Sequence, residues 1–221
     1  MRDNPTTVSC ALRPALVASL IALAGVLASP AALAQAKYDV SMLPPYCKYT
    51  QLYREKVPGA DQAGIDRWNN ILGARNFWHL HHYCFGLEHS NQALYSSRSK
   101  QERDSELRES VIEFRYVLER VAPDFALLPE ILTRKGENLL RLGNGAEGVM
   151  DLNRAIELKP DHWPPYAALS DYYRTLGDLG EARTWAERGL SAAPGTKALQ
   201  RRLEELDKAK ASSPVKSTVQ K

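Results

Sequence analysis

The sequence predicts an all-α protein, a solenoid of stacked helical hairpins closed by a C-terminal capping helix. Three observations predict this fold. Two segments, residues 129–162 and 163–196, align without a gap at a spacing of 34 residues. Apolar residues recur in them at the intervals of a 3.6-residue helix, and glycines and prolines stand where helices would end. The chain has 221 residues, 44% hydrophobic and 25% charged, which is the composition of a globular protein.

Residues 1–36 predict a signal peptide for export. Arg2 and Arg13 precede an apolar run over residues 15–27, and small residues then lead to two alternative cleavage sites, after Ala34 or after Ala36. The apolar run is shorter than the roughly 20 residues that a membrane-spanning helix needs. We therefore expect a periplasmic or secreted mature chain, with no stable membrane insertion after the signal peptide is removed.

Residues 37–60 predict an irregular N-terminal arm, because their prolines and tyrosines favour wrapping around the first helices over forming strands. Of the three cysteines, Cys10 lies in the predicted signal peptide, so Cys47 and Cys84 form the pair that remains in an oxidising compartment. We favour a disulfide between them over two free thiols or a metal or haem site. Such a bridge would hold the arm against the helices and contribute roughly 3 to 4 kcal/mol.

Residues 61–128 predict helices with a less regular pattern. Asp61 can N-cap a short helix that runs through residue 72. A first long helix over residues 77–94 has Trp78, His82 and Phe85 at i, i+4 and i+7, and a second apolar stripe covers residues 107–121. The residues between them, about 95–104, are rich in Ser, Arg and Lys. They predict an insertion, which is either a longer connection or an extension of the helices.

The two aligned segments each predict a helix, a turn and a second helix. Gly143 and Gly177 align at the point where the first helix of each hairpin must stop. Pro160 and Pro194 align just past the second helices, where a residue that cannot continue a helix marks the end of the unit.

A final helix is predicted over residues 197–211. Leu199, Leu203 and Leu206 share one face of it, and most of the other side chains are charged or polar. A helix with a polar outer face can cap the open end of a solenoid. Residues 212–221 lack periodicity and predict a disordered tail.

A 34-residue helix–turn–helix unit, with a small residue where its helices touch and a closing proline, resembles the tetratricopeptide repeat (TPR) family. Residues 163–196 are the better match, and residues 129–162 depart from the pattern at Lys135, where the family prefers leucine. Residues 61–128 look like a degenerate third unit with an insertion. Ser110 then takes the small-residue position, Phe114 the aromatic one, and His82 the position of helix contact.

The resemblance implies a concave groove lined by the first helices of successive units, which in this family holds a peptide or an extended segment. We expect Arg141 and Arg174 to form a row of guanidinium groups that binds carboxylates. The predicted function is an exported TPR scaffold or adaptor that binds protein or peptide partners in assembly or maintenance of the cell envelope. Carried over by position, the groove residues are Thr133, Glu137, Leu140, Arg141, Ala167, Asp171, Arg174 and Thr175.

The alternative function is that of a metal- or haem-handling periplasmic protein, since imidazole and thiolate are common ligands of zinc and copper. Its ligands would be His79, His81, His82 and Cys84. The spacing lacks the motifs of a structural zinc site, a zinc peptidase or a haem attachment site. The leading prediction needs no cofactor.

Two other classes of function are not expected. The 29 Lys and Arg residues and the 26 Asp and Glu residues are interspersed, for a net charge of +3, whereas a nucleic-acid binder usually carries a basic stripe. The sequence has no nucleophile elbow, phosphate-binding loop or dinucleotide fingerprint. We therefore predict that the protein is not an enzyme.

Overall fold

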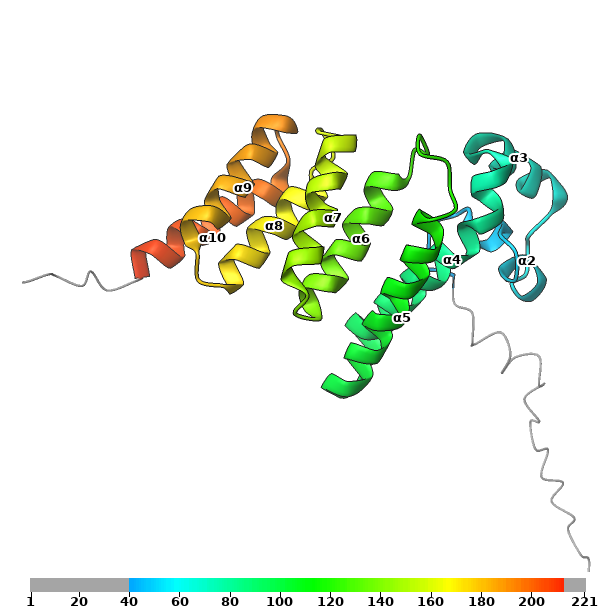
Figure 1. Ribbon diagram of the computed structural model, residues 1–221, viewed down its shortest axis with the longest axis horizontal. Helices are drawn as coiled ribbons and strands as arrows, with labels where there is room; N and C mark the ends of the chain where they lie inside the picture. Colours follow the sequence, from blue (N-terminus) through cyan, green and yellow to red (C-terminus); the bar gives the residue numbers. More distant parts are fainter. Residues whose placement is uncertain (1–39, 213–221) are drawn as a thin grey trace, which may run out of the picture.

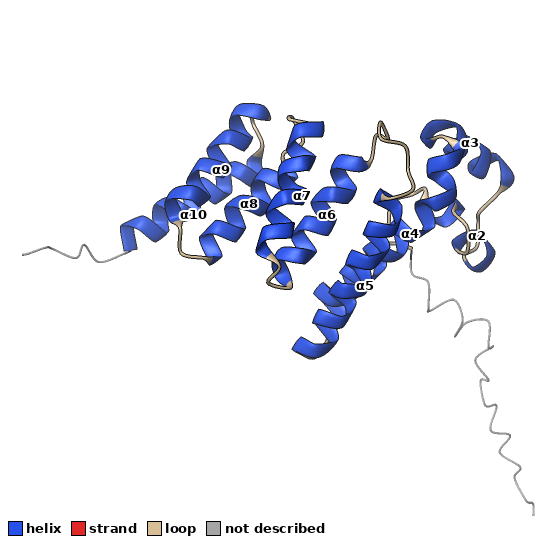
Figure 2. Ribbon diagram, in the orientation of Figure 1, coloured by secondary structure: helices blue, strands red, loops and turns tan. Residues whose placement is uncertain are grey.

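The structure, a computed structural model, describes residues 40–212; the predicted signal peptide and nearly all of the predicted tail lie outside this range. Between residues 40 and 212 the chain forms helices and no strand (Figure 2), and the predicted all-α solenoid is confirmed. None of these helices has both the length and the apolar content needed to cross a bilayer. In chain order the elements are the 3₁₀-helix η1 (Cys47–Tyr49), α2 (Tyr53–Lys56), α3 (Gln62–Leu72), α4 (Ala74–Asn91), the π-helix η2 (Gln92–Ser96), α5 (Lys100–Leu118), α6 (Leu128–Arg141), α7 (Gly145–Leu158), α8 (Pro164–Thr175), α9 (Leu179–Ala192) and α10 (Lys197–Ser212).

Successive helices pair as the hairpins α4–α5, α6–α7 and α8–α9, which stack side by side (Figure 1). The α10 helix packs against α9 and α8 at the end of the stack. Leu199 and Leu206 of α10 are buried there, while most of the helix is exposed. The predicted capping helix is therefore present, and it covers an apolar end that would otherwise face water.

Glycine determines the geometry of the regular hairpins at two kinds of position. Gly143 and Gly177 follow the first helices with φ of 85° and 81°, in the left-handed region that other residues adopt only with strain. Gly136 lies where α6 and α7 touch, and a Cβ there would come within 2.9 Å of Leu152 Cγ and 3.0 Å of the Gly148 carbonyl oxygen. The small-residue pattern of the sequence thus corresponds to close helix contact.

The first hairpin differs in register from the prediction. Its contact residue on α4 is Gly86, where a Cβ would lie 2.4 Å from the Phe114 ring, and Ser110 Oγ donates a hydrogen bond to the Gly86 carbonyl at 2.7 Å. His82, predicted at this position, lies one turn earlier and is half-buried. An imidazole does not fit where a glycine is needed for the helices to touch, so the contact moves by four residues.

The insertion in this hairpin is an extension of the helices. The contact pair Gly86 and Ser110 is separated by twice as many residues as the corresponding pair Gly136 and Gly148. The additional residues prolong α4 through η2 and add turns to the start of α5, so that α5 projects past α6 (Figure 1). Ser99 caps α5 in a capping box with Glu102, which favours a helix over a longer loop.

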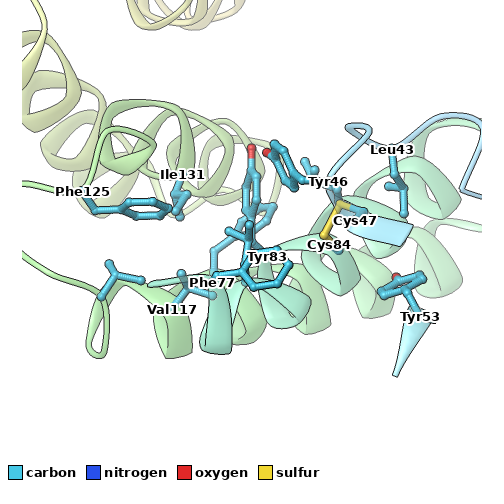
Figure 3. Packing of buried hydrophobic residues seen from close by; sticks show 14 residues of the cluster. Leu43, Tyr46, Cys47, Tyr53, Phe77, Tyr83, Cys84, Val117, Phe125 and Ile131 are labelled. Carbon is cyan, nitrogen blue, oxygen red and sulfur yellow. A yellow bond between two sulfur atoms is a disulfide. The ribbon is translucent and has the colours of Figure 1, made fainter. Parts of the chain in front are cut away.

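The N-terminal arm is held on the first hairpin by a disulfide between Cys47 and Cys84, the pair for which the sequence predicts a bridge (Figure 3). Both cysteines are fully buried, and their Cα atoms are 5.7 Å apart. The arm is more ordered than predicted, because it forms η1 and α2. Tyr53 of α2 is also fully buried and donates a hydrogen bond from its hydroxyl to Glu88 at 2.7 Å.

Lys135, the departure from the family pattern, is buried in the α6–α7 interface. Its Nζ donates to Asp151 Oδ2 at 2.8 Å and to Glu147 Oε1 at 2.9 Å. Burial raises the pKa of Asp151, against the lowering effect of Lys135, whereas the hydrogen bond from Lys135 lowers the pKa of the more exposed Glu147. A buried ion pair therefore replaces the expected apolar contact.

Candidate functional site

A hollow with a volume of about 600 Å³ lies between α6 and α8. Residues of the α7–α8 connection and Arg202 of α10 complete its wall. It forms because both helices are the first of their hairpins and expose equivalent faces on the same side of the stack. Of the predicted groove residues, the hollow brings together Thr133, Glu137, Leu140, Arg141, Ala167, Asp171 and Thr175.

The floor of the hollow is formed by small side chains. Thr133 and Ala167 are only 2% and 3% exposed, and the Thr133 hydroxyl donates to the Pro129 carbonyl at 2.6 Å. The side walls carry two aromatic side chains, the partly exposed Trp163 and Tyr172. The hollow thus offers apolar and aromatic surface beside a few polar groups, a combination typical of binding sites.

Arg174 is the predicted groove residue that does not line the hollow, so the row of Arg141 and Arg174 does not form. The residue 34 positions after Arg141 is Thr175, and Arg174 is therefore rotated by about 100° around the helix axis. In place of Arg174, the hollow contains Arg202 of the capping helix α10. Arg202 Nη2 donates to Asp171 Oδ2 at 2.5 Å, and Arg174 lies 3.7 Å from the other oxygen of Asp171.

Charges of both signs line the α6 side of the hollow. The guanidinium groups of Arg134 and Arg141 lie 3.7 and 3.9 Å from Glu137 Oε2. Burial acts to lower the pKa of Arg134, but the carboxylates of Glu137 and Glu130 and the Tyr83 hydroxyl outweigh it, and the pKa is raised. Arg134 therefore stays charged at any physiological pH.

A second hollow of about 470 Å³ adjoins the first. Glu130, Arg134, Glu137 and Arg141 of α6 line both, so the two form one continuous trough across the stack. The other side of the second hollow consists of residues 41–44 of the N-terminal arm together with residues of α4 and η2.

Sequence reasoning missed the α4 side of the trough, because it placed the α4 contact at His82. Aligning Gly86 with Gly136 shifts the register by one turn. Leu87, Ser90 and Asn91 of α4 then occupy the positions of Glu137, Leu140 and Arg141, and all three line the second hollow. The sequence signal that could have identified these residues is Gly86, the small residue of α4 that aligns with Gly136.

The histidine cluster does not assemble into a metal site. His82 Nδ1 lies 2.5 Å from Glu113 Oε2, His81 Nδ1 lies 3.0 Å from the Trp78 carbonyl, and the Cys84 sulfur is bonded to Cys47. Burial, followed by the charge of His82, lowers the pKa of His81 to about 4, and burial also lowers the pKa of His79. Within residues 40–212 no group of three or more His, Cys, Asp or Glu side chains is placed to hold a metal ion. The structure gives the metal- or haem-handling alternative no support.

Comparisons with known proteins show similarity to one family model and to solved structures. The family model of the tetratricopeptide repeat matches residues 164–196, which comprise α8 and α9 with the turns that follow them. A solved structure of the first TPR of Spaghetti (RPAP3) bound to the HSP90 peptide SRMEEVD is similar with a TM-score of 0.42 and 20% identity, over 59% of this chain and 96% of that one. A similarity of this size does not indicate what the chain binds. No curated protein matches the sequence.

Proposed function

We propose that this chain is an exported adaptor that binds an extended peptide segment of a partner protein in the trough along α6 and α8. The observation that carries the proposal is the hollow of about 600 Å³ between α6 and α8. Its lining includes seven of the eight residues that the sequence predicts for the groove. A trough of this kind accommodates an extended chain, because side chains of two neighbouring helices line it along its length.

The chemistry of the trough suits a peptide that carries carboxylates. Arg141 Nη1 donates to Asn138 Oδ1 at 3.0 Å, which fixes the guanidinium group at the edge of the trough. Asn138 is itself held by the buried hydroxyls of Ser90 and Ser110, at 2.7 and 2.9 Å from its Nδ2. A guanidinium group held in this way loses little conformational entropy when it binds a carboxylate.

The proposed setting is the bacterial cell envelope. Two features support export: the tripartite pattern of residues 1–36 and the disulfide between Cys47 and Cys84, a bond that persists in oxidising compartments. Cell fractionation with alkylation of free thiols tests this setting. Recovery of the full-length chain in the cytosol with Cys47 and Cys84 reduced would contradict it.

Charge reversal tests the binding site, and the chain offers a matched control. Arg141→Glu places a carboxylate in the trough and should abolish capture of partners from an envelope extract. Arg174→Glu changes the same charge on a half-exposed side chain outside the trough and should leave capture intact. Both variants should keep the helicity of the parent in circular dichroism. Equal capture by the two variants would exclude Arg141 from the binding site.

A further inference from the structure

We infer that the second hollow is an anchor pocket for a large apolar side chain of the bound peptide, next to an acidic residue that Arg134 and Arg141 hold. This inference rests on the proposed function and specifies the partner's chemistry. The N-terminal arm adds Met42 to the wall of this hollow, and the insertion in the first hairpin adds Leu94 and Tyr95. Neither the arm nor the insertion occurs in the regular units.

Exposed apolar side chains converge on this pocket. Met42, Leu94 and Tyr95 are 59%, 45% and 70% exposed, and all three line it. Leu87 lies buried at its base. Large apolar side chains that gather on an exposed surface mark a site of interaction, whereas scattered ones do not.

The insertion gives these side chains their position. Leu94 and Tyr95 belong to η2, the π-turn that prolongs α4, and such turns are frequent at functional sites. The Asn91 side chain approaches the Met42 carbonyl at 3.5 Å, which keeps the arm beside the end of α4. At 70% exposure Tyr95 contributes little to the core. Core packing therefore does not explain why a tyrosine occupies this position.

The charges beside the pocket complement a carboxylate. Arg134 and Arg141 flank the single carboxylate of Glu137 at 3.7 and 3.9 Å, beyond hydrogen-bond distance. Glu130, the other acid of the shared wall, accepts a hydrogen bond from the Tyr83 hydroxyl at 2.7 Å. The two guanidinium groups can therefore donate to a second carboxylate, and an extended peptide that enters the anchor pocket must pass them to reach the first hollow.

A phage library of random linear peptides, flanked on both sides by Gly-Ser linkers so that chain ends are not selected, tests the inference on the disulfide-bonded chain. We expect enriched sequences to pair an aromatic or long aliphatic residue with Asp or Glu. An enriched peptide, synthesised with a fluorophore and blocked ends, should bind Leu94→Ser and Tyr95→Ser about tenfold or more weakly, the loss expected for one buried apolar side chain. Ile112→Ser is the matched control, since Ile112 is 54% exposed on α5 and does not line the trough.

The outcomes separate this inference from the proposed function. Peptides that bind the parent chain, lose binding in Arg141→Glu and keep it in Leu94→Ser and Tyr95→Ser would overturn the anchor pocket and leave the trough as a peptide site. A library without any binder, or binders indifferent to Arg141→Glu, would overturn both. Self-association of the parent chain that Tyr95→Ser abolishes would also overturn the inference, because a second copy would then occupy the pocket.

Discussion

Replacing Lys135 by leucine restores the residue that the repeat pattern prefers, and yet the structure predicts that it destabilises the fold. The substitution leaves Asp151, which is 6% exposed, without its cation in the α6–α7 interface. The carboxyl group can escape an unpaired buried charge by binding a proton. From its usual pKa of 3.8, protonation at pH 7 costs about 4 kcal/mol, at about 1.4 kcal/mol per pH unit. That value sets the scale of the expected loss.

Urea unfolding with the disulfide intact measures the loss as a shift of the midpoint at constant slope. The cost should fall to about 2 kcal/mol at pH 5, because the protonated carboxyl then forms more readily. Lys135→Leu combined with Asp151→Leu should recover most of the stability, since an apolar pair can replace a buried ion pair. Lys100→Leu, which removes an exposed partner of Asp104, is the control and should leave the urea midpoint unchanged. A loss below about 1 kcal/mol in Lys135→Leu, or an equal loss in the double variant, would show that Asp151 does not depend on Lys135 in the folded protein.

Three further predictions concern the first hairpin. Gly86→Ala should cost about 1 to 3 kcal/mol in urea unfolding, because its Cβ would lie 2.4 Å from the Phe114 ring; a neutral effect would show that the helices are not in contact there. Cys47→Ser with Cys84→Ser should lower the free energy of unfolding by roughly 3 to 4 kcal/mol, and an unchanged urea midpoint would be inconsistent with the bridge. The lowered pKa of His81, about 4 against 6.5 in the unfolded chain, means that the unfolded state binds more protons below pH 6.5. Stability should therefore be fully present above pH 6.5 and fall by about 3 kcal/mol towards pH 4, and His81→Gln should flatten this dependence in pH-resolved thermal melts.

The regular part of the fold follows from the sequence, because local signals and packing agree there. Gly143 and Gly177 end helices through their backbone conformation alone, and Gly136 and Gly148 sit where two helices must touch. Each of these constraints acts within one hairpin. The same position in the next hairpin is therefore found by adding 34 residues. The groove residues on α6 and α8, apart from Arg174, follow from the same spacing.

The irregular part depends on contacts that no spacing encodes. The choice between His82 and Gly86 is decided by the Phe114 ring of the partner helix, and the family pattern favoured the wrong turn. The place of Arg202 in the trough depends on how the capping helix docks, which periodicity does not specify. Arg174 was misplaced because a shift of one residue rotates a side chain by about 100°. The N-terminal arm lines the trough because the disulfide with Cys84 and the packing of the arm hold it against α4.

Photo-crosslinking from the trough tests whether a partner peptide binds there. Trp163 lines the first hollow and is 38% exposed, whereas Trp78 is 60% exposed on α4 outside the trough. A photoreactive phenylalanine replaces either tryptophan with a side chain of similar size. We expect the Trp163 variant to crosslink a defined peptide segment of a partner in cells and Arg141→Glu to abolish this crosslink. The Trp78 variant should give no crosslink to the same segment. Equal crosslinking from both positions, or a Trp163 crosslink that persists with Arg141→Glu, would contradict the assignment of the trough as the binding site.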